Sequence, residues 1–529
     1  MSSESLPLSD ARNQTDVFAV HGADPEVLAY AMAKYSRSAL SMRESLTEIS
    51  AQRAEQFLNT FYFQYGHRSI ADLAHIAFAV ERLSLLAAIV LVDEQRWDGQ
   101  ERSTRYQNFQ KSGWFFPDFG QDKSSETLYS DTVKGLFDAY QRTTAAVLEA
   151  LRRRVTRPEA MKPEAYERTL KARAFDVARY LLPLATNTSL GQIVNARTLE
   201  TQVSRLLSHP AAEVRDLGRK LRDAATGPAW NVQAQAGAAL VEKIRAADPA
   251  LAEEAANLLT REVKTAPTLV KYAEPNAYLM ETRKDLECIA AEVLKGLPIA
   301  PAPLVDLVER TESLEVELAA TLIYWGSDYS YRQVRDVVAS LPEARVLEII
   351  ELGLRRRGRH DEALRAFHAG AALRFDVLMD IGGFRDMHRH RRVTQIKQEF
   401  TAALGYETPV VGDLGPDVNL LAEAGMEADF KATVEAAHSA SRKIAAGSAP
   451  EAAVSALYAL PLATRIRCLF KMDFAEAQYI SELRSAVAGH FSYRRVAWEM
   501  YRAVERQHPA LAKYIRVTDF TQPIDLLQR

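Results

Sequence analysis

The feature that most constrains this chain is a long-range repeat. The segment Pro-Leu-Ala-Thr at 183–186 recurs at 461–464, an offset of 278 positions. In both halves, 12 residues separate its proline from the start of a long helical pattern, at Asn195 and at Asp473. A repeat that keeps its spacing to a matching pattern indicates duplication of one fold. The 529 residues therefore predict two tandem copies of about 260 residues each, rather than two different modules.

A proline-rich segment with few charges lies near the middle of the chain. Residues 296–303 read GLPIAPAP. Successive prolines interrupt helices and favour extended backbone, so this segment is typical of a linker. We expect an N-terminal repeat at 1–290, a linker at 291–305 and a C-terminal repeat at 306–529.

Helical periodicity dominates both halves. Apolar residues at spacings of three and four run from Ile76 to Val90 and from Val346 to Leu354. Alternating, β-branched segments are few, and the best strand candidates are 374–379 and 406–411. The expected fold class is α+β, mostly helical with a small sheet.

Charge and cysteine content narrow the classes of function. The 66 basic and 69 acidic residues give a net charge of −3, which favours neither a nucleic-acid polymer nor an anionic membrane as partner. No apolar segment reaches the roughly 20 residues of a membrane span, and the first residues lack a secretory pattern. Two cysteines cannot form a disulfide framework. We expect a soluble protein of the reducing cytoplasm.

The densest cluster of chemically active residues is Asp386-Met387-His388-Arg389-His390-Arg391-Arg392. The simplest interpretation is a solvated basic helix face. A metal site formed by His388, His390 and His368 is a second, but neighbouring arginines would repel a cation. The third is a clamp for an anion or cofactor, because guanidinium groups bind phosphate and carbonyl oxygens with two hydrogen bonds.

In the first half, Glu101, Ser103 and Arg105 stand at alternate positions. In an extended loop the three side chains would project to the same side. Arg105 and Ser103 could then hold a phosphate while Glu101 faces a sugar hydroxyl or a base. A surface ladder of ion pairs is the alternative.

These two segments together resemble the signature of flavin-dependent thymidylate synthases, the ThyX family, which reads RHRxxSxNExSxRY. Arg389-His390-Arg391 with Thr394 resembles its beginning, and Glu101, Ser103, Arg105 and Tyr106 resemble its end. In the first half, Asp93, Glu94 and Gln95 stand at the RHR positions, and in the second half the Arg-Tyr ending is missing.

Two further segments carry the resemblance. Gly66-His67-Arg68-Ser69 is similar to the family's GHxSxxEH segment, although Asp72 and Leu73 replace its last two residues. Residues 178–199 are similar to the family's AR-x-LLPL and NARSL segments. The second half has Asp473-Phe474-Ala475 in place of NAR and Leu457 in place of Arg179, but it keeps Arg484 where the first half has Leu206. The resemblance covers about residues 28–220 and, more weakly, 318–505.

The resemblance implies a fold of helices around a small antiparallel sheet, and sites shared between unlike halves. It implies FAD as cofactor, with dUMP, methylenetetrahydrofolate and NADPH as substrates, and no enzyme nucleophile. Family members are tetramers, so a double-length chain is expected to form a homodimer. The residues carried over for FAD are Arg389, His390, Arg391, Asn195, Arg197 and Ser69. Those carried over for dUMP are Glu101, Ser103, Arg105, Arg179 and Arg484, with Arg389, Arg105 and Arg179 as catalytic groups.

Other functions stay open. Because each half has lost part of the motif, the chain could be a non-catalytic scaffold that binds flavin or nucleotide. A flavoenzyme for another pyrimidine nucleotide is a related alternative. The weakest alternative is a nucleic-acid-binding protein that uses residues 355–360 and 388–392, because the net charge of the chain is near zero. Cys288 and Cys468 lie in apolar contexts that we interpret as helical, where inert thiols are common.

Overall fold

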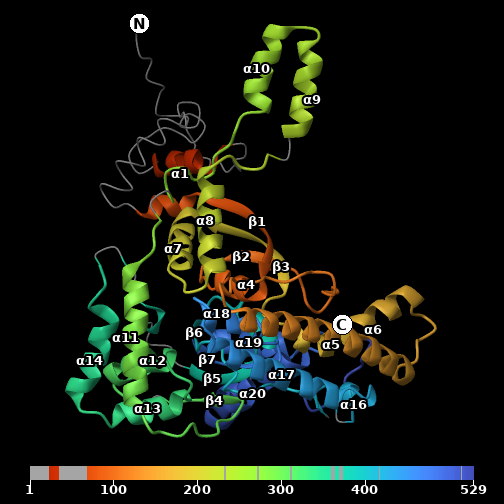
Figure 1. Cartoon of the computed structure of the whole chain (residues 1–529), viewed down its shortest axis with the longest axis vertical. Helices are drawn as coiled ribbons and strands as arrows, with labels where there is room; N and C mark the ends of the chain where they lie inside the picture. Colours follow the sequence, from red (N-terminus) through yellow and green to blue (C-terminus); the bar gives the residue numbers. More distant parts are fainter. Residues whose placement is uncertain are drawn as a thin grey trace, which may run out of the picture. The chain divides into compact units, whose positions relative to one another are not determined.

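The computed structural model describes residues 23–34, 68–231, 234–270, 273–309, 312–358, 361, 364–367, 373–410, 412–415, 417–513 and 515–528. Contacts divide the chain into a first unit (Met1–Ile76, Asn195–Arg197 and Arg222–Tyr272) and a second unit formed by the remaining residues, and each is considered by itself (Figure 1). The N-terminal segment considered for secretion, the pair Gly66-His67, and His360 and His368 lie outside the described residues.

The first unit is helical. The helix α1 (Pro25–Lys34) packs against the 3-10 helix η2 (Arg68–Leu73). The buried carboxylate of Glu26 accepts the backbone N–H groups of Thr268 and Leu269 at 2.9 and 2.8 Å. The unit also contains the hairpin of α9 (Ala234–Arg245) and α10 (Pro249–Leu259).

The second unit holds most of both repeats. The elements of the first half are β1 (His75–Ser84), α4 (Leu85–Leu91), β2 (Asp98–Glu101), α5 (Lys123–Arg154), α6 (Pro163–Ala178), η3 (Arg179–Leu181), β3 (Asn187–Asn195), α7 (Ala196–Leu207) and α8 (Ala212–Thr226). Two of these, β1 and α8, continue into the first unit, as does the junction of β3 and α7.

The second half begins with a helical layer. Its first elements are α11 (Ala277–Val293), β4 (Val305–Leu307), α12 (Leu314–Trp325), α13 (Tyr331–Ala339), α14 (Glu343–Leu354) and η4 (Arg365–Phe367). They are followed by β5 (Leu373–Asp380), α15 (Ile381–Met387), β6 (Thr394–Lys397), α16 (Leu420–Glu423), α17 (Glu427–Ala445), α18 (Ala452–Leu457), β7 (Arg465–Met472), α19 (Phe474–Ser485), α20 (Phe491–Gln507) and α21 (Pro509–Ala512).

The two sheets show the duplication directly. The first sheet has the strand order β1-β3-β2 and the second has β4-β5-β7-β6, so β5-β7-β6 repeats the order of the first sheet. Strands β5 and β7 pair antiparallel, as do β2 with β3 and β6 with β7. In the first half, the short helix α4 follows β1 and the longer helix α7 follows β3. In the second half, the short helix α15 follows β5 and the longer helix α19 follows β7. The expected mostly helical fold with two copies around small antiparallel sheets is confirmed.

The repeated Pro-Leu-Ala-Thr segments contact each other. The N–H of Leu184 donates to the carbonyl of Leu460 at 2.8 Å, and the N–H of Leu462 donates to the carbonyl of Leu182 at 2.9 Å. The prolines of the two segments form an antiparallel bridge between these bonds. Each half therefore gives and receives the same bonds, which is the pattern of a two-fold axis between two like subunits.

A second pair of symmetric contacts joins the halves through buried carboxylates. Ser84 caps α4, and its hydroxyl donates to Glu213 of α8 at 2.6 Å. The same carboxylate accepts the hydroxyl of Tyr458, which belongs to the second half, at 2.9 Å. Burial raises the pKa of Glu213 although these bonds oppose the rise.

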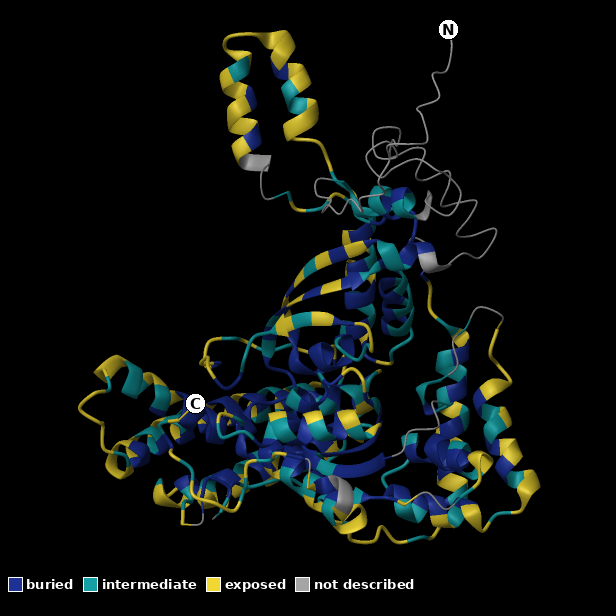
Figure 2. Cartoon of the chain, turned by 180° about the vertical axis from the view of Figure 1, so that it is seen from behind, coloured by how far each residue is buried: buried dark blue, intermediate teal, exposed yellow. Residues whose placement is uncertain are grey.

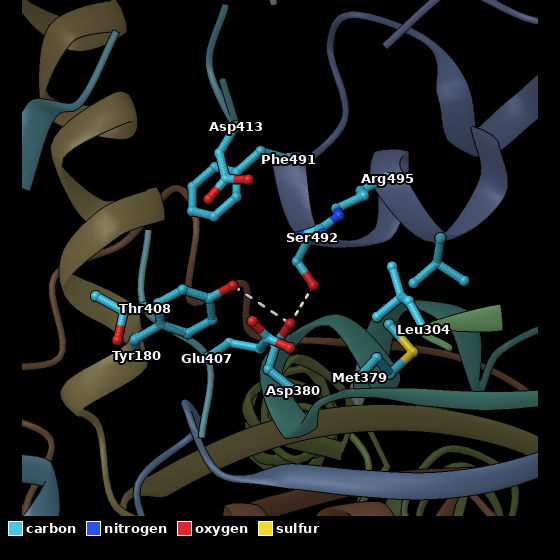
Figure 3. A pocket seen from close by; sticks show the side chains of 11 residues that line it. Tyr180, Leu304, Met379, Asp380, Glu407, Thr408, Asp413, Phe491, Ser492 and Arg495 are labelled. Carbon is cyan, nitrogen blue, oxygen red and sulfur yellow. Dashed lines mark hydrogen bonds between the residues drawn. The ribbon is translucent and has the colours of Figure 1, made fainter. Parts of the chain in front are cut away.

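In the other half the carboxylate and the hydroxyl have exchanged places. Asp380 caps α15 and accepts the hydroxyl of Ser492 of α20, and Tyr180 of the first half donates to it at 3.3 Å (Figure 3). Because Tyr180 and Tyr458 each stand three residues before the repeated proline, both clamps occupy the same place in the two-fold arrangement.

The core of the C-terminal helical layer lies among α11, α12, α13 and α14. Its buried residues include Leu286, Ile323, Val338 and Ile349, and Leu469 of β7 packs on them from the sheet. All but one of the residues of β5 are buried, and α20 is among the elements that pack on this strand. Figure 2 shows how burial is distributed over the chain. None of the helices in the described parts of the chain is both long and apolar enough to cross a bilayer.

Some of the local expectations need correction. Residues 76–83 lie in a strand, β1, and only Ala87 and Val90 of that periodic series are helical, in α4. Residues 406–410 form no strand beyond a single bridge at Tyr406. The helix at 346–354 and the strand at 374–379 are confirmed by α14 and β5.

The cysteine environments also differ from the expectation. Cys468 lies in the strand β7 and is buried, and burial raises the pKa of its thiol well above the usual value. Cys288 does lie in a helix, α11, but it is exposed. The proline-rich segment 296–303 contains neither helix nor strand.

Candidate functional site

The turn that follows β2 directs Arg105 into the interior of the second unit. Its Nε donates to Asp176 of α6 at 2.9 Å, and its other nitrogens donate to the Tyr493 hydroxyl at 2.8 Å and the Ala488 carbonyl at 3.0 Å. Burial lowers the pKa of Arg105, but the charge of Asp176 reverses that effect and raises it. Arg105 is therefore a permanent cation that joins the first half to α20 of the second.

Arg179 lies at the start of η3 and is 1% exposed. One nitrogen donates to Oδ2 of Asp386 at 3.2 Å, whereas Nε and Nη2 have no hydrogen-bond partner among the described residues. A side chain at Gly382 would bring its Cβ within 3.5 Å of both atoms, so the glycine keeps this space open. Buried guanidinium donors without an acceptor are costly, and an anion or water would satisfy them.

Asp386 of α15 is surrounded by arginines from both halves. Burial would raise the pKa of its carboxyl, but Arg179, Arg105, Arg389 and Arg484 outweigh burial and lower it to about 2. The carboxylate is therefore ionised at neutral pH and acts as the internal counter-ion of this group.

The end of β2 meets α15 through Glu101. Its carboxylate is 5% exposed and pairs with Arg385, while Arg389 lies 3.6 Å from its second oxygen. The predicted Glu101 and Arg389 are thus brought together from opposite halves of the chain.

His390 joins α15 to α19. Its Nε2 accepts a hydrogen bond from Nε of Arg484 at 2.8 Å, and its Nδ1 lies 3.4 Å from Glu476. Burial lowers the pKa of His390, and the opposing effect of Glu476 does not overcome it. Because an arginine can only donate, the neutral ring carries its proton on Nδ1. The ring of Tyr493 lies 5.5 Å from the Arg484 guanidinium and 5.7 Å from that of Arg105.

These groups form one site, called the arginine cluster below. Its cations are Arg105, Arg179, Arg385, Arg389 and Arg484, and its anions are Glu101, Asp176 and Asp386. Asp380, whose carboxyl interacts with Arg179, and Glu476, beside His390, are further carboxylates at the edge of the cluster. A buried concentration of guanidinium donors favours binding of an anion.

Other predicted residues lie outside the arginine cluster. The hydroxyl of Ser103 accepts the backbone N–H of Arg105 at 3.2 Å, within its own loop. The prediction that the side chains of Glu101, Ser103 and Arg105 project to the same side is therefore wrong. Arg391 pairs with Asp98 of β2 at the surface.

The NAR residues belong to the first unit. Asn195 and Arg197 both contact Asp72 of η2, at 3.5 and 3.2 Å. Ser69 lies in η2, and its side chain is outside the described part. This group is separate from the unit that contains the arginine cluster.

The histidines considered for a metal have other bonds. His388 Nδ1 bonds to Oε1 of Gln395 at 2.9 Å, and burial lowers the pKa of its ring. His390 uses Nε2 for Arg484, as described above. Among the described residues, no three or more His, Cys, Asp or Glu side chains are grouped so that they could hold a metal ion.

Sequence reasoning did not assign Arg385, Asp176 or Tyr493. Arg385 stands one helical turn before Arg389, so a periodic interpretation of the basic run could have found it. Asp176 likewise stands three residues before Arg179 on adjoining helical turns. Tyr493 carries no comparable local signal, because its contact with Arg105 joins residues 388 positions apart.

The two-fold related position in the chain lacks this set of charges. Asp386 and Val90 are the sixth residues of α15 and α4, and Arg484 and Leu206 are the eleventh of α19 and α7. Leu457 stands before its Pro-Leu-Ala-Thr segment where Arg179 stands before the other. Among the described residues, apolar side chains thus stand at three positions equivalent to charged members of the arginine cluster.

A small cavity lies beside the Asp380 clamp (Figure 3). Its volume is about 20 Å³, room for about one water molecule, and it is lined by Asp380, Asp413, Glu407 and Arg495 among others. Burial raises the pKa of both Asp380 and Asp413 to about 6. It is too small for a nucleotide, so the arginine cluster is the better candidate site.

Comparisons with known proteins agree with the duplication. The Thy1 family model, thymidylate synthase complementing protein, matches residues 19–227 and 308–510. A UPF0159 protein of Chlamydia muridarum is 28% identical, with 94% of this chain and 91% of that protein aligned. A flavin-dependent thymidylate synthase of Clostridium tetani is 26% identical over 33% of this chain and 67% of that protein.

Among solved structures, ThyX from Helicobacter pylori complexed with FAD and dUMP is 17% identical. It covers 38% of this chain and 89% of its own, with a TM-score of 0.26. The family match is the decisive finding, since it covers more than half of the residues and occurs once in each repeat. The chain therefore belongs to the thymidylate synthase complementing protein family, Thy1, and carries the family's region twice.

Proposed function

We propose that this protein is a flavin-dependent thymidylate synthase-like methyltransferase that converts dUMP to dTMP at the arginine cluster. In this proposal FAD is the cofactor, and NADPH and methylenetetrahydrofolate are co-substrates. The nucleotide site is composite, because its residues come from unlike repeats of one chain.

The observation that carries the proposal is the state of Arg179. A guanidinium that is 1% exposed presents Nε and Nη2 without an acceptor among the described residues, beside a glycine that leaves space. A phosphate oxygen would accept both hydrogen bonds in the forked geometry that arginine favours.

The charge of the arginine cluster supports a nucleoside monophosphate. Its guanidinium groups suit a phosphate monoester, which carries about −1.5 to −2 at neutral pH. A nucleoside without phosphate would leave Nε and Nη2 of Arg179 without an acceptor.

The residues of this chain divide the work by position. Arg179 and Arg105 lie deepest and would bind the phosphate, with Asp176 and Tyr493 orienting Arg105. Arg389, whose side chain is 31% exposed, lies at the rim. There it would stabilise negative charge on the uracil carbonyls as C5 becomes nucleophilic, which is catalysis by positioning and electrostatics.

The same rim has groups that suit a flavin. Arg389 is a donor for carbonyl oxygens, and the His390 ring is kept neutral and oriented by Arg484 and Glu476. Flavin, when bound, supplies the redox chemistry of the methyl transfer. Asn195, Arg197, Arg391 and Ser69 remain proposed FAD contacts.

One nucleotide per chain is expected, since Val90, Leu206 and Leu457 replace the charged groups at the equivalent position. We also propose a homodimer located in the cytoplasm, with the repeats bounded as 1–290 and 306–529 around a linker at 291–305.

The test measures binding and turnover separately. Binding of dUMP is measured by titration calorimetry, and turnover by tritium release from C5-labelled dUMP with FAD, NADPH and methylenetetrahydrofolate. Arg179→Leu should weaken dUMP binding by at least tenfold, since it removes a buried charged hydrogen bond. Leu457 at the equivalent position indicates that the fold accepts leucine there. Arg389→Ala and Arg105→Ala should abolish turnover, and the surface variant Arg392→Ala should retain it.

The outcomes separate the alternatives. Binding of dUMP and FAD without turnover would favour the non-catalytic scaffold, and turnover with another pyrimidine nucleotide would favour the related flavoenzyme. If neither dUMP nor FAD binds, the proposal fails.

A further inference from the structure

The hairpin of α9 and α10 lies between the two regions that match the family, so neither repeat accounts for it. Its turn is well specified, because Asp248 caps α10 by accepting the N–H groups of Ala250 and Leu251 at 3.0 and 3.1 Å. Pro249 occupies the first helical position, where a proline is favourable. The chain thus builds a defined pair of helices for a purpose outside the duplicated fold.

The two helices touch along a seam of small residues. A Cβ at Gly237 would lie 2.9 Å from the carbonyl oxygen of Leu259, so the helices approach closely there. Val241 and Ala252 are buried, whereas most of the other described positions of the hairpin are exposed (Figure 2). Within the described chain, no other element packs extensively on either helix.

The outer surface of the hairpin is apolar to an unusual degree. The side chains of Leu240, Leu251 and Leu258 are 48%, 51% and 73% exposed. Leu251 and Leu258 are seven residues apart and therefore share one face of α10. Isolated helices of 11 and 12 residues are marginal in water, so this surface needs a partner to bury it.

Both helices of the hairpin carry charges that form no ion pair with any described residue. These are Lys243, near the end of α9, and Glu253 and Glu254 in α10, whereas Glu242 and Arg245 of α9 pair with each other. Because Gly237 contacts Leu259, the antiparallel helices place Lys243 level with Glu253 and Glu254. Glu254 stands three residues after Leu251 and four before Leu258, so it shares their face of α10, and Glu253 lies on the other side of the helix.

We propose that the α9–α10 hairpin binds the same hairpin of a second copy of this chain, forming a four-helix bundle about a two-fold axis along the hairpin. Each α9 then lies against the partner's α10, so all neighbouring helices are antiparallel. Lys243 meets the partner's Glu254, which shares a face with the leucines, and the exposed leucines are buried. A two-fold contact closes on itself and uses one surface twice, which suits a surface that carries both signs of charge.

The test is the oligomeric state of the full-length protein, measured by sedimentation velocity over a range of concentrations. The wild-type chain should be a dimer, and Leu251→Glu combined with Leu258→Glu should weaken dimerisation by at least about tenfold. The matched control is Leu347→Glu, since Leu347 of α14 is 47% exposed and lies outside the hairpin. It should leave the dimer unchanged. A monomeric wild type, or a dimer unaffected by the paired glutamates, would overturn the proposal.

Charge reversal gives an independent readout that does not depend on apolar burial. Lys243→Glu and Glu254→Lys should each weaken the dimer, and the double variant should restore it, because the pair is then present with reversed polarity. Failure of the double variant to recover would contradict the arrangement. Neither experiment depends on the proposed enzymatic activity.

Discussion

Replacing Asp386 by asparagine is expected to change stability and anion affinity in opposite directions. The arginines around this carboxyl lower its pKa from 3.8 to about 2, even after the cost of burial. A drop in pKa from 3.8 to about 2 corresponds to roughly 2.4 kcal/mol of preference for the charged form, of which part is lost to relaxation. Asparagine cannot carry that charge, so at neutral pH and without a bound anion Asp386→Asn should lower the free energy of unfolding by roughly 2 kcal/mol.

The pH dependence follows from the direction of the shift. Because the folded pKa lies below the unfolded value, the contribution of Asp386 is complete above about pH 4 and is lost as pH falls towards about 2. The difference in stability between the wild type and the variant should therefore narrow over that interval.

An added anion should reverse the order of stability of the wild type and Asp386→Asn. The carboxylate of Asp386 accepts from Nη1 of Arg179, beside the Nε and Nη2 donors that a phosphate would use, so it repels a second anion there. Two unit charges about 5 Å apart repel by roughly 3 kcal/mol at an effective dielectric constant near 20. Part of this is lost through relaxation, so Asp386→Asn should bind dUMP or inorganic phosphate about tenfold more tightly.

The assay is urea denaturation with increasing phosphate, together with calorimetric titration of dUMP. Phosphate should stabilise the variant more than the wild type. For each protein, the gain in unfolding free energy grows with the logarithm of the ratio of the phosphate concentration to the dissociation constant. Asp429→Asn is the control, since Asp429 forms only an exposed pair with Arg142. If Asp386→Asn is as stable as the wild type without anions, or binds phosphate less tightly, the carboxylate is not an internal substitute for a ligand.

Further predictions concern groups outside the cluster. Because the folded pKa of Asp380 is raised to about 6, unfolding free energy should fall as pH rises from about 4 to 6, and Asp380→Asn should remove part of that fall in urea denaturation. A thiol reagent should modify Cys288 in the native protein and Cys468 only after unfolding, and two rapidly reacting thiols would contradict this. Lys471→Met should cost about 3 kcal/mol or more because it takes the ammonium away from buried Glu317 at 3.1 Å, and adding Glu317→Leu should recover most of the loss in the same denaturation assay.

The parts of the fold that sequence predicted best are those with local patterns. Helices with an apolar stripe, such as α14, and the Pro-Leu-Ala-Thr repeat could be recognised in one dimension. The strand β1 could not, because its burial alternates in only part of its length and its end continues directly into the buried helix α4. The apolar spacings of three and four between Ile76 and Val90 therefore come from a strand followed directly by a helix, two elements whose periods differ.

The site was predictable to the extent that motifs are contiguous. Glu101, Arg105, Arg179, Arg389 and Arg484 could be chosen from segments, and all five lie together in the second unit. What no segment could indicate is that Arg179 would bond to Asp386, or which tyrosine would hold Arg105. Those contacts depend on how the two halves face each other.

That arrangement explains how each half could lose residues without losing the site. The paired Pro-Leu-Ala-Thr segments set the halves about a two-fold axis, which makes two equivalent composite positions. When the halves are identical subunits encoded by one gene, a substitution alters both positions at once. Within one chain the positions are independent, so Leu206 and Leu457 could replace arginines at one position while Arg484 and Arg179 remained at the other. Removing buried charges from a position that binds no anion relieves desolvation, and duplication thereby favours a chain with one charged site and one apolar seam.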